Sequence, residues 1–190
     1  MQGGTDRVPD QVPAVDPDGP PRAVLIAALL LAVLAVGAVL TVAAVRRTPA
    51  APVVIAAVPA PAAEGPECAA LFAALPDQLG DYRRAETAQP TPAATAAWRT
   101  DEAGTEPVIM RCGLDRPGEF VVGAPIQMVN EVQWFRIEDT ELRRSTWLCV
   151  DRPVYVALTL PDGSGPSPIQ TMSEVIEKEM PAVPIRPGRP

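Results

Sequence analysis

Residues 22–47 read RAVLIAALLLAVLAVGAVLTVAAVRR, and the 23 residues between the flanking arginines carry no charge. As an α-helix, a run of this length measures about 34 Å and crosses a hydrocarbon core of about 30 Å with some tilt. The sequence therefore predicts a transmembrane helix over residues 23–45. A cleaved signal peptide is the alternative, because residues 41–44 are small, but the apolar region of a signal peptide normally spans only about 7 to 15 residues. We therefore favour an uncleaved anchor.

The charges around this segment do not set its orientation. Arg7 and Arg22 precede it, and Arg46 and Arg47 follow it, so the positive-inside rule gives a tie. A long C-terminal domain crosses a membrane largely regardless of its own charge. The linker and the cysteines described below favour a single-pass protein of the plasma membrane with its C-terminal domain outside the cytoplasm. A cytoplasmic domain with reduced thiols remains the alternative on charge alone.

Proline-rich segments flank the predicted helix and close the chain. Residues 1–22 combine five prolines with four Asp and lack a periodic apolar face, which predicts a disordered N-terminal tail. Residues 46–66 are rich in Ala and Pro, so we expect an extended linker that holds a domain away from the bilayer. Residues 182–190 repeat this composition and predict a flexible tail. The remaining residues, 67–181, are predicted to form one extracytoplasmic α+β domain.

Two helices are predicted to frame this domain. In PECAALFAALP (66–76), an apolar stripe follows the helical period behind a proline suited to the first turn. The stripe comprises Cys68, Leu71, Phe72 and Leu75. In SPIQTMSEVIEKEMP (167–181), Ser167 is predicted as the N-cap and Pro168 as the first helical residue. The buried side of this second helix is predicted to comprise Ile169, Met172, Ile176 and Met180.

Four further segments have the composition and alternation of β-strands. They are residues 107–113 (PVIMRCG), 132–138 (VQWFRIE), 145–150 (STWLCV) and 154–160 (VYVALTL). In the first, Val108, Met110 and Cys112 share one face, and the last two are predicted to form a hairpin through residues 151–153. The fold class that follows is α+β. A single N-terminal transmembrane helix precedes a small domain, in which a short N-terminal helix and a C-terminal helix pack on a largely antiparallel sheet of about four strands.

The three cysteines allow three pairings, each of which leaves one thiol over. We favour a disulfide between Cys68 and Cys112, because both lie on faces predicted to point inward and the bond joins the first helix to the first strand. Such a bond requires an oxidising compartment. Cys149 is predicted to be a buried small hydrophobic residue and not a reactive thiol, since neither Lys nor His lies near it in sequence. The cysteines are too widely spaced for a zinc knuckle, so no metal site is predicted.

The order of these segments resembles that of a known family. CAALFAALP, AAW, VIMRCG, VNEVQW and RPVYVALTLP follow one another as in domain of unknown function 3515, an uncharacterised actinobacterial family. The residues that match the family pattern are Cys68, Leu71, Leu75, Pro76, Arg111, Cys112 and Gly113. The resemblance covers roughly residues 67–180, implies an exported or single-span envelope protein, and supports the Cys68–Cys112 pairing. It implies no particular activity.

Charge and composition argue against several classes of function. Residues 48–190 hold 19 acidic against 12 basic residues, and an acidic surface without a basic stripe argues against nucleic-acid binding and peripheral lipid binding. The chain has no histidine, which removes Ser/His/Asp and Cys/His catalysis and His-ligated zinc. The acidic cluster of Glu138, Asp139 and Glu141 matches no calcium loop and is interpreted as a solvated turn. PDGSGPSP (161–168) lacks the lysine of a phosphate-binding loop and is interpreted as a turn before a helix.

No catalytic residue and no cofactor is predicted, and the balance is against enzymatic activity. We expect a membrane-anchored envelope protein with a non-enzymatic accessory or interaction domain, whose partner is a membrane-protein complex or a cell-wall component. An exposed cluster of Trp98, Trp134 and Trp147 would mark the contact surface, whereas burial would make them ordinary core residues. The alternative is a carboxylate-based cell-wall enzyme or a ligand-binding domain, which a concave pocket holding an acidic residue of raised pKa would indicate.

Overall fold

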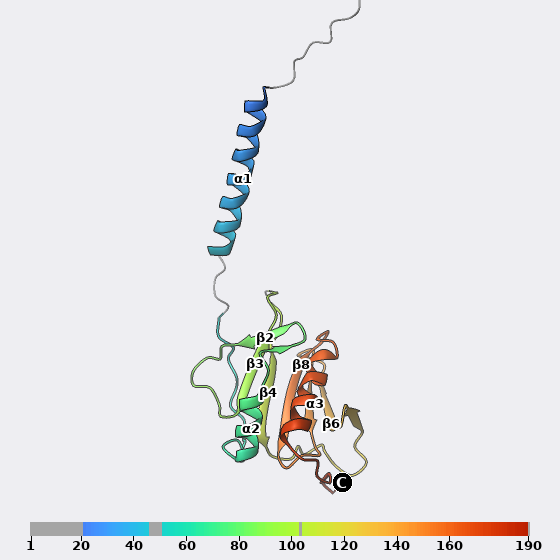
Figure 1. Ribbon diagram of the computed structural model, residues 1–190. Coiled ribbons are helices and arrows are strands. Elements are labelled where there is room, and N and C mark those ends of the chain that lie inside the picture. The colour runs from blue at the N-terminus through green and yellow to red at the C-terminus, as the bar shows by residue number, and fades with distance from the viewer. Residues whose placement is uncertain (1–20, 46–50, 103, 190) are drawn as a thin grey trace, which may run out of the picture. The chain divides into compact units, whose positions relative to one another are not determined.

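The computed structural model describes residues 21–45, 51–102 and 104–189 (Figure 1). The tail predicted to be disordered over residues 1–22 lies almost wholly outside the described residues, as do Arg46 and Arg47. The chain divides into two units after Ala50, and each unit is considered by itself.

The first unit contains α1, Arg22–Val45, a helix of 24 residues. Its bounds agree with the predicted segment to within one residue. Its large apolar side chains from Val24 to Val42 are exposed, and the helix is long and apolar enough to cross a membrane. A signal sequence near the N-terminus can also meet this criterion of length and hydropathy.

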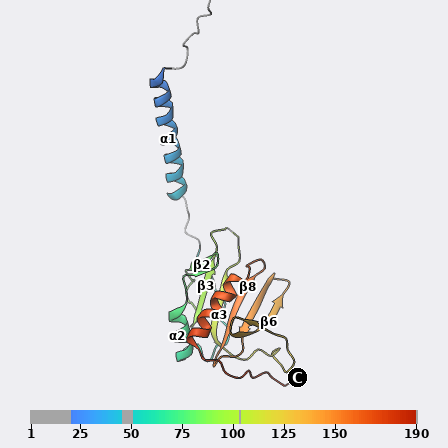
Figure 2. The same ribbon diagram turned by 45° about the vertical axis from the view of Figure 1, so that its right-hand side comes forward.

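The second unit is built on one antiparallel sheet of eight strands, in the order β1-β2-β3-β4-β8-β7-β6-β5 (Figures 1 and 2). The strands are β1 (Gln78–Leu79), β2 (Tyr82–Ala85), β3 (Thr95–Arg99), β4 (Val108–Leu114), β5 (Ile126–Val129), β6 (Val132–Asp139), β7 (Arg144–Cys149) and β8 (Tyr155–Pro161). Two runs of four consecutive strands meet where β4 pairs with β8. The edge strands β1 and β5 have only two and four residues, which limits the unpaired backbone that an open sheet presents.

The sheet has more strands than the four that the sequence predicts. The predicted segments correspond to β4, β6, β7 and β8, and the last two form the expected antiparallel pair. The prediction missed β1, β2, β3 and β5. β2 is YRRA and β3 is TAAWR, so neither carries the β-branched alternation that marks a strand, and β1 is too short to show a period. Pairing with β4, from Thr95↔Arg111 to Trp98↔Val108, holds β3 in the sheet.

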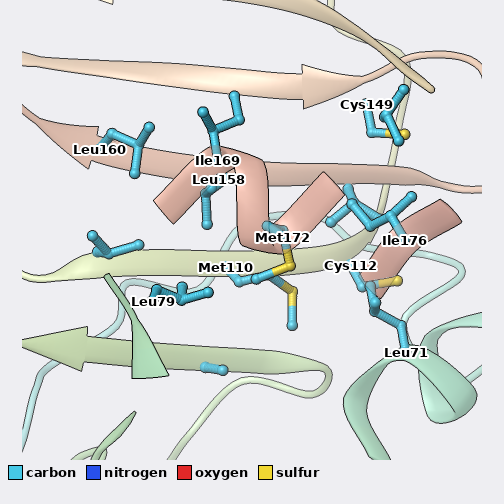
Figure 3. Packing of buried hydrophobic residues seen from close by; sticks show 14 of the residues in the cluster. Leu71, Leu79, Met110, Cys112, Cys149, Leu158, Leu160, Ile169, Met172 and Ile176 are labelled. Atoms are coloured by element: carbon cyan, nitrogen blue, oxygen red, sulfur yellow. The ribbon is translucent and has the colours of Figure 1, made fainter. Parts of the chain in front are cut away.

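Helices α2 (Pro66–Ala74) and α3 (Ser167–Glu179) lie on the same face of this sheet (Figure 1). Their apolar side chains and those of the strands beneath them form the main core (Figure 3). Its largest fully buried members include Trp98, Trp134, Leu71, Met110, Met172 and Ile176. The side of α3 that was predicted to face inward is buried, as is Met180 immediately after the helix. The structure is therefore α+β, as predicted, with a larger sheet.

Two local predictions about the helices were wrong. Phe72 was placed on the buried stripe of α2, but it is exposed, because this helix of nine residues turns only Cys68 and Leu71 fully into the core. Ser167 was predicted to cap α3, but Pro166 holds the N-cap position without a side-chain hydrogen bond, and Ser167 is the first helical residue.

The opposite face of the sheet is partly covered by residues 51–65, which we call the strap. Val53 and Ile55 are buried with Ala97 and pack against Ala85 and Ile109. The backbone amide of Val53 donates to the Glu86 carbonyl at 2.8 Å, and the Ala88 amide donates to the Val53 carbonyl at 2.9 Å. The strap therefore belongs to the domain and not to the extended linker predicted over 46–66, because its PVVI sequence supplies apolar side chains that the sheet buries.

The C-terminal segment covers the other half of the same face. A second cluster forms where the β4–β5 connection and this segment meet the sheet, and it contains Phe120, Phe135, Leu148, Val150, Ala157 and Ile185. The Gly188 amide donates to the Phe120 carbonyl at 2.8 Å, and the Val183 amide donates to the Asp151 carbonyl at 2.9 Å. The flexible tail predicted over 182–190 is therefore corrected: its described residues are attached to the domain by packing and hydrogen bonds.

The packing of the strap can be tested with two neighbouring residues. Ile55 is 6% exposed and Val54 is 79% exposed. We expect Ile55→Ala to lower the free energy of unfolding by about 2 kcal/mol or more, because it leaves a cavity against the sheet. Val54→Ala, the matched control, should change it by less than about 0.5 kcal/mol. Urea unfolding of the full chain in detergent measures both, and equal effects would contradict the packing of the strap.

Candidate functional site

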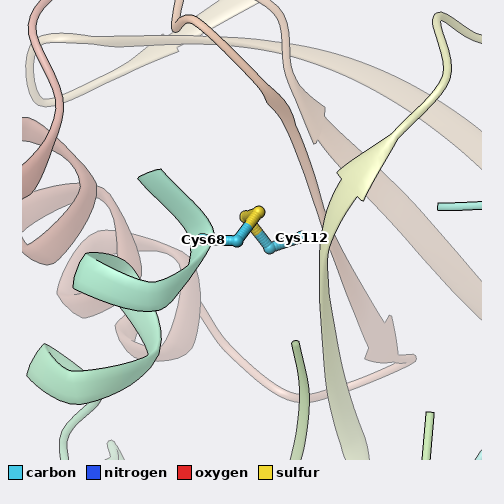
Figure 4. Close-up of a disulfide and its surroundings, with 2 residues drawn as sticks. All are labelled: Cys68 and Cys112. Carbon is cyan, nitrogen blue, oxygen red and sulfur yellow. A yellow bond between two sulfur atoms is a disulfide. The ribbon is translucent and has the colours of Figure 1, made fainter. Parts of the chain in front are cut away.

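The Cys68–Cys112 disulfide joins α2 to β4 (Figure 4). The two Cα atoms lie 5.6 Å apart, and both residues are almost fully buried, with 0% and 1% exposure. The structure thus contains the pairing favoured by the sequence, between the inward faces of the helix and the strand. The bond closes a loop with a sequence separation of 44, and restricting the unfolded chain in this way corresponds to about 4 kcal/mol of stabilisation.

Gly113, the next residue of β4, lets the strap approach the strand closely. A β-bulge separates Cys112 from Leu114, and Gly113 has a φ of +85°, a conformation that residues with a Cβ rarely adopt. A Cβ here would overlap the backbone of Ala62 and Ala63. The Ala62 amide instead donates to the Gly113 carbonyl at 3.1 Å. Consecutive residues of β4 therefore hold α2 by a covalent bond and the strap by a hydrogen bond.

Cys149 lies at the end of β7, beside a buried carboxylate. It is free and buried, and its thiol donates to Asp151 Oδ1 across 3.6 Å. Burial raises the pKa of the Cys149 thiol, and the negative charge of Asp151 raises it further. The thiol is therefore protonated at neutral pH and is not a nucleophile.

Asp151 and Arg152 form a buried ion pair in the β7–β8 turn. Arg152 Nη1 lies 2.8 Å from Asp151 Oδ2, and the two side chains are only 2% and 3% exposed. Arg152 Nη2 also donates to the Glu131 carbonyl at 2.9 Å, while the Asp151 carbonyl accepts from Val183. The pair thus connects the β5–β6 turn, the β7–β8 turn and the C-terminal segment, which is a structural role.

The tryptophans do not form an exposed cluster. Trp98 and Trp134 have 0% exposure, and their indole N–H groups donate to the Pro76 carbonyl at 2.9 Å and to Ser173 Oγ at 3.0 Å. Trp147 is half-buried, beneath the Arg136 guanidinium at 5.2 Å. The interpretation as ordinary core residues therefore holds for Trp98 and Trp134, and the contact-surface interpretation does not.

A hollow of about 680 Å³ lies beside α2 and is lined by Pro76, Asp77, Gln78, Arg83 and Arg84. The Arg84 guanidinium stands over the rings of Phe72 and Trp98, at 5.2 and 4.9 Å from their centroids. Burial lowers the pKa of Arg84, and Asp77 partly offsets this effect. The two rings hold a cation in a fixed position beside an exposed aromatic side chain. We call Phe72 and Arg84 the Arg84 surface.

A smaller hollow of about 150 Å³ adjoins Arg111 on β4. Its walls come from the strap, the segment before β3 and β4 itself, and comprise Ala56, Val58, Ala60, Ala63, Pro92, Ala93, Thr95, Arg111 and Cys112. Arg111 is half-buried, and its Nε atom is buried without a hydrogen-bond partner. Burial lowers the pKa of Arg111, and repulsion from Arg144 lowers it further. Within the described residues no carboxylate lies within ion-pair distance of this guanidinium.

Of the polar motifs considered as sites in the sequence, Glu138 and Asp139 end strand β6, and Glu141 lies in the turn that follows. Glu138 pairs with Arg136 at 3.0 Å, and Asp139 pairs with Arg144 at 3.5 Å while accepting from the Leu142 amide at 3.0 Å. Residues 161–168 form a turn with positive φ at Gly163 and Gly165 before α3. In the part of the chain that the structure describes, no group of three Cys, Asp or Glu residues is placed to hold a metal ion.

The chain matches the sequence model of one known family. The sequence model of a family described as Protein of unknown function (DUF3515) matches residues 29–185. The chain belongs to this family. The match extends through most of α1 and the whole sheet, so this DUF3515 chain carries the family pattern in both of its units. No curated protein and no solved structure matched the chain.

Sequence reasoning missed the buried Arg152 and the half-buried Arg111 of this DUF3515 domain. Residues 151–153 were predicted only as a turn, because the local sequence does not show that the C-terminal segment covers this turn. Arg111 appeared in the family pattern without a role, but its position carried a signal. It shares a face of β4 with Ile109, so a strand covered on both sides must bury it.

The buried pair can be compared with an exposed one. We expect Asp151→Asn to destabilise the full chain by about 3–5 kcal/mol, because it leaves the buried Arg152 charge uncompensated. Glu138→Gln removes the partner of Arg136, whose pair is exposed by 36% and 59%, and should cost less than about 1 kcal/mol. Urea unfolding measures the difference. Equal small losses would show that Asp151 does not neutralise Arg152.

Proposed function

We propose that this protein is a single-span membrane protein whose C-terminal domain lies outside the cytoplasm and acts as a non-enzymatic interaction domain of the cell envelope. Its partner in this proposal is a membrane-protein complex or a cell-wall component. The observation that carries the proposal is the buried Cys68–Cys112 disulfide in a chain that also has a membrane-length helix.

The disulfide supports the location of the domain. Disulfides persist in oxidising compartments and are rare in the cytosol. The arginines around α1 give no direction, so the proposed orientation rests on the redox argument. The exposed apolar surface of α1 supports an anchor that stays attached, because 24 residues exceed the usual apolar length of a signal peptide.

The chemistry of the buried polar groups supports a non-enzymatic role. The chain has no histidine, and two of its three cysteines are joined. The third is kept protonated by burial, which raises its pKa, and the nearby Asp151 is committed to Arg152 at 2.8 Å. Groups that acid–base or nucleophilic catalysis would require are thus engaged in holding the fold.

The Arg84 surface is the contact region we favour in place of the tryptophans. Phe72 is 43% exposed, and the Arg84 guanidinium is held over it at 5.2 Å. Aromatic and arginine side chains are the residues most enriched at protein interfaces. Because the rings fix Arg84 in advance, little side-chain freedom is lost when a partner binds.

A ligand-binding role is the second candidate, and the hollow at Arg111 favours it. This hollow combines apolar walls with a guanidinium that lacks a carboxylate among the described residues. The residues that line it include no acid, so it supports binding and not the carboxylate-based catalysis considered from the sequence.

The proposed location predicts the state of the three cysteines in cells. After acid quenching and denaturation, a polymer-tagged maleimide should modify about one thiol per chain without reductant and all three after reduction. In the control variant, Cys149→Ala, no thiol should be modified without reductant and two should be modified after reduction. A gel-shift assay counts the thiols. Three modified thiols without reductant would place the domain in a reducing compartment.

The proposed contact region predicts where a partner can be captured. A photo-crosslinking amino acid at position 72 should yield a reproducible adduct in native membranes, whereas the same group at position 142 should not. Phe72 and Leu142 are both exposed apolar residues, at 43% and 56%, and only Phe72 adjoins Arg84. Mass spectrometry of the adducts identifies the partner. Identical adducts at both positions, or none at position 72, would contradict this surface.

A further inference from the structure

Arg111 occupies an unusual place for a positive charge. It projects from β4 in the interior of the sheet, between Thr95 of β3 and Ala157 of β8, which are its paired neighbours. Both of these are buried, at 7% and 3% exposure. A buried charge is costly unless an opposite charge and hydrogen bonds compensate it. Arg111 itself is half-buried, and within the described residues its buried Nε atom has no hydrogen-bond partner and no carboxylate lies within ion-pair distance.

The contrast with Arg152 shows what is missing. Both arginines have a buried Nε atom without a partner. Arg152 is neutralised by Asp151 at 2.8 Å and donates to two backbone carbonyls. The charged neighbour that perturbs Arg111 is the like charge of Arg144, and burial and this repulsion both lower the pKa of Arg111. The surroundings of Arg111 therefore favour the binding of an anion.

The adjoining hollow limits the size and shape of that anion. Its volume is about 150 Å³, enough for a small organic acid and too small for a chain of several residues. Apart from Arg111, its walls are mostly methyl and methylene groups, from Ala56, Ala60, Ala63 and Pro92 among others. Thr95 Oγ1 donates to the Pro92 carbonyl at 2.7 Å, so its lone pairs remain free to accept. Such walls favour a short apolar group over a second charge.

We propose that the hollow at Arg111 binds a carboxylate carried on a small apolar group, such as the C-terminal alanine of a peptide. The guanidinium would hold the carboxylate by paired, charge-assisted hydrogen bonds, and the strap would contact the methyl group. This inference goes beyond the proposed function and does not depend on which side of a membrane the domain occupies.

The charge of the whole domain restricts how such a ligand is recognised. Residues 48–190 carry a net charge of −7, from 19 acidic and 12 basic residues, so long-range attraction does not draw anions to the surface. Screening reduces this repulsion beyond about 8 Å at physiological salt. Contact with Arg111 must then supply the selectivity. A phosphate, with more charge and more acceptor oxygens, would need further donors that the walls do not offer.

The test uses the full chain in detergent, labelled with ¹⁵N, and three probes. N-acetyl-alanine is the carboxylate, N-acetyl-alaninamide is its neutral counterpart, and inorganic phosphate is a second anion. We expect N-acetyl-alanine to shift the Nε–H resonance of Arg111 in a saturable manner, and the amide to leave it in place. Phosphate should give a weaker effect or none. No saturable shift with N-acetyl-alanine, or tighter binding of phosphate, would overturn the assignment.

Variants separate binding from folding. Arg111→Gln should weaken N-acetyl-alanine binding by about tenfold or more, because charge-assisted hydrogen bonds are lost, as followed through backbone amides of the strap. Arg83→Gln, an exposed arginine on the same face of the sheet, is the matched control and should bind as the parent does. Undiminished binding by Arg111→Gln would overturn the proposal.

Two further variants keep the test decisive if Arg111→Gln folds poorly. Ala93→Leu adds bulk at an exposed wall position of the hollow and retains Arg111, so it should fold normally and lose binding. Arg111→Met should leave the melting temperature of the unliganded protein unchanged or raised, since it removes an uncompensated charge. A clear fall in melting temperature, together with unaltered binding by Ala93→Leu, would assign Arg111 a purely structural role.

Discussion

The covalent bond between Cys68 and Cys112 fixes where the chain enters the domain. Cys112 and Gly113 are consecutive in β4, and one holds α2 while the other accepts a hydrogen bond from the strap at 3.1 Å. The strap and α2 are themselves consecutive in sequence. Without the bond, a helix of nine residues with only two fully inward side chains would depend on packing alone, and helices this short are marginal without tertiary contacts. The bond therefore secures both the helix that covers one face of the sheet and the C-terminal end of the strap, which covers the other.

The sequence predicts the elements whose side chains alternate strongly, and it misses those defined by their neighbours. β4, β6, β7 and β8 are rich in β-branched and aromatic residues and were predicted. β2 and β3 consist mostly of Arg and Ala, and they become strands because β3 pairs with β4 and β2 pairs with β3. Burial of the strap was missed for a related reason. Its composition is that of a linker, and only the apolar patch formed by Ala97 and Ile109 shows that Val53 and Ile55 have a surface to cover.

The same distinction applies to the candidate sites. The disulfide could be predicted because two cysteines lay on faces of recognisable period. The buried Asp151–Arg152 pair could not be predicted, because its burial depends on the C-terminal segment that returns across the second face of the sheet. The position of Arg111 beside Ile109 gave a signal, but only the structure shows that the strap covers this part of the face. That face combines two apolar patches with the half-buried guanidinium of Arg111, and its cover comes from the strap on one side and the C-terminal segment on the other. The two segments that cover this face thus lie over different polar groups. The C-terminal segment covers the Asp151–Arg152 pair, and the strap lines the hollow beside Arg111.

An odd number of cysteines raises the question of why one pairing persists. Thiol–disulfide exchange requires a thiolate that can reach a sulfur of the existing bond. Cys149 belongs to the same buried cluster as Cys68 and Cys112, so its protonation state matters. Burial and the Asp151 carboxylate both raise its pKa, and the thiol donates its proton toward that carboxylate. Arg152 holds the Asp151 carboxylate in place at 2.8 Å, so the ion pair that holds the β7–β8 turn also positions the group that accepts the thiol proton of Cys149. The buried charges and the disulfide are in this way parts of one arrangement, in which the turn protects the pairing that the fold requires.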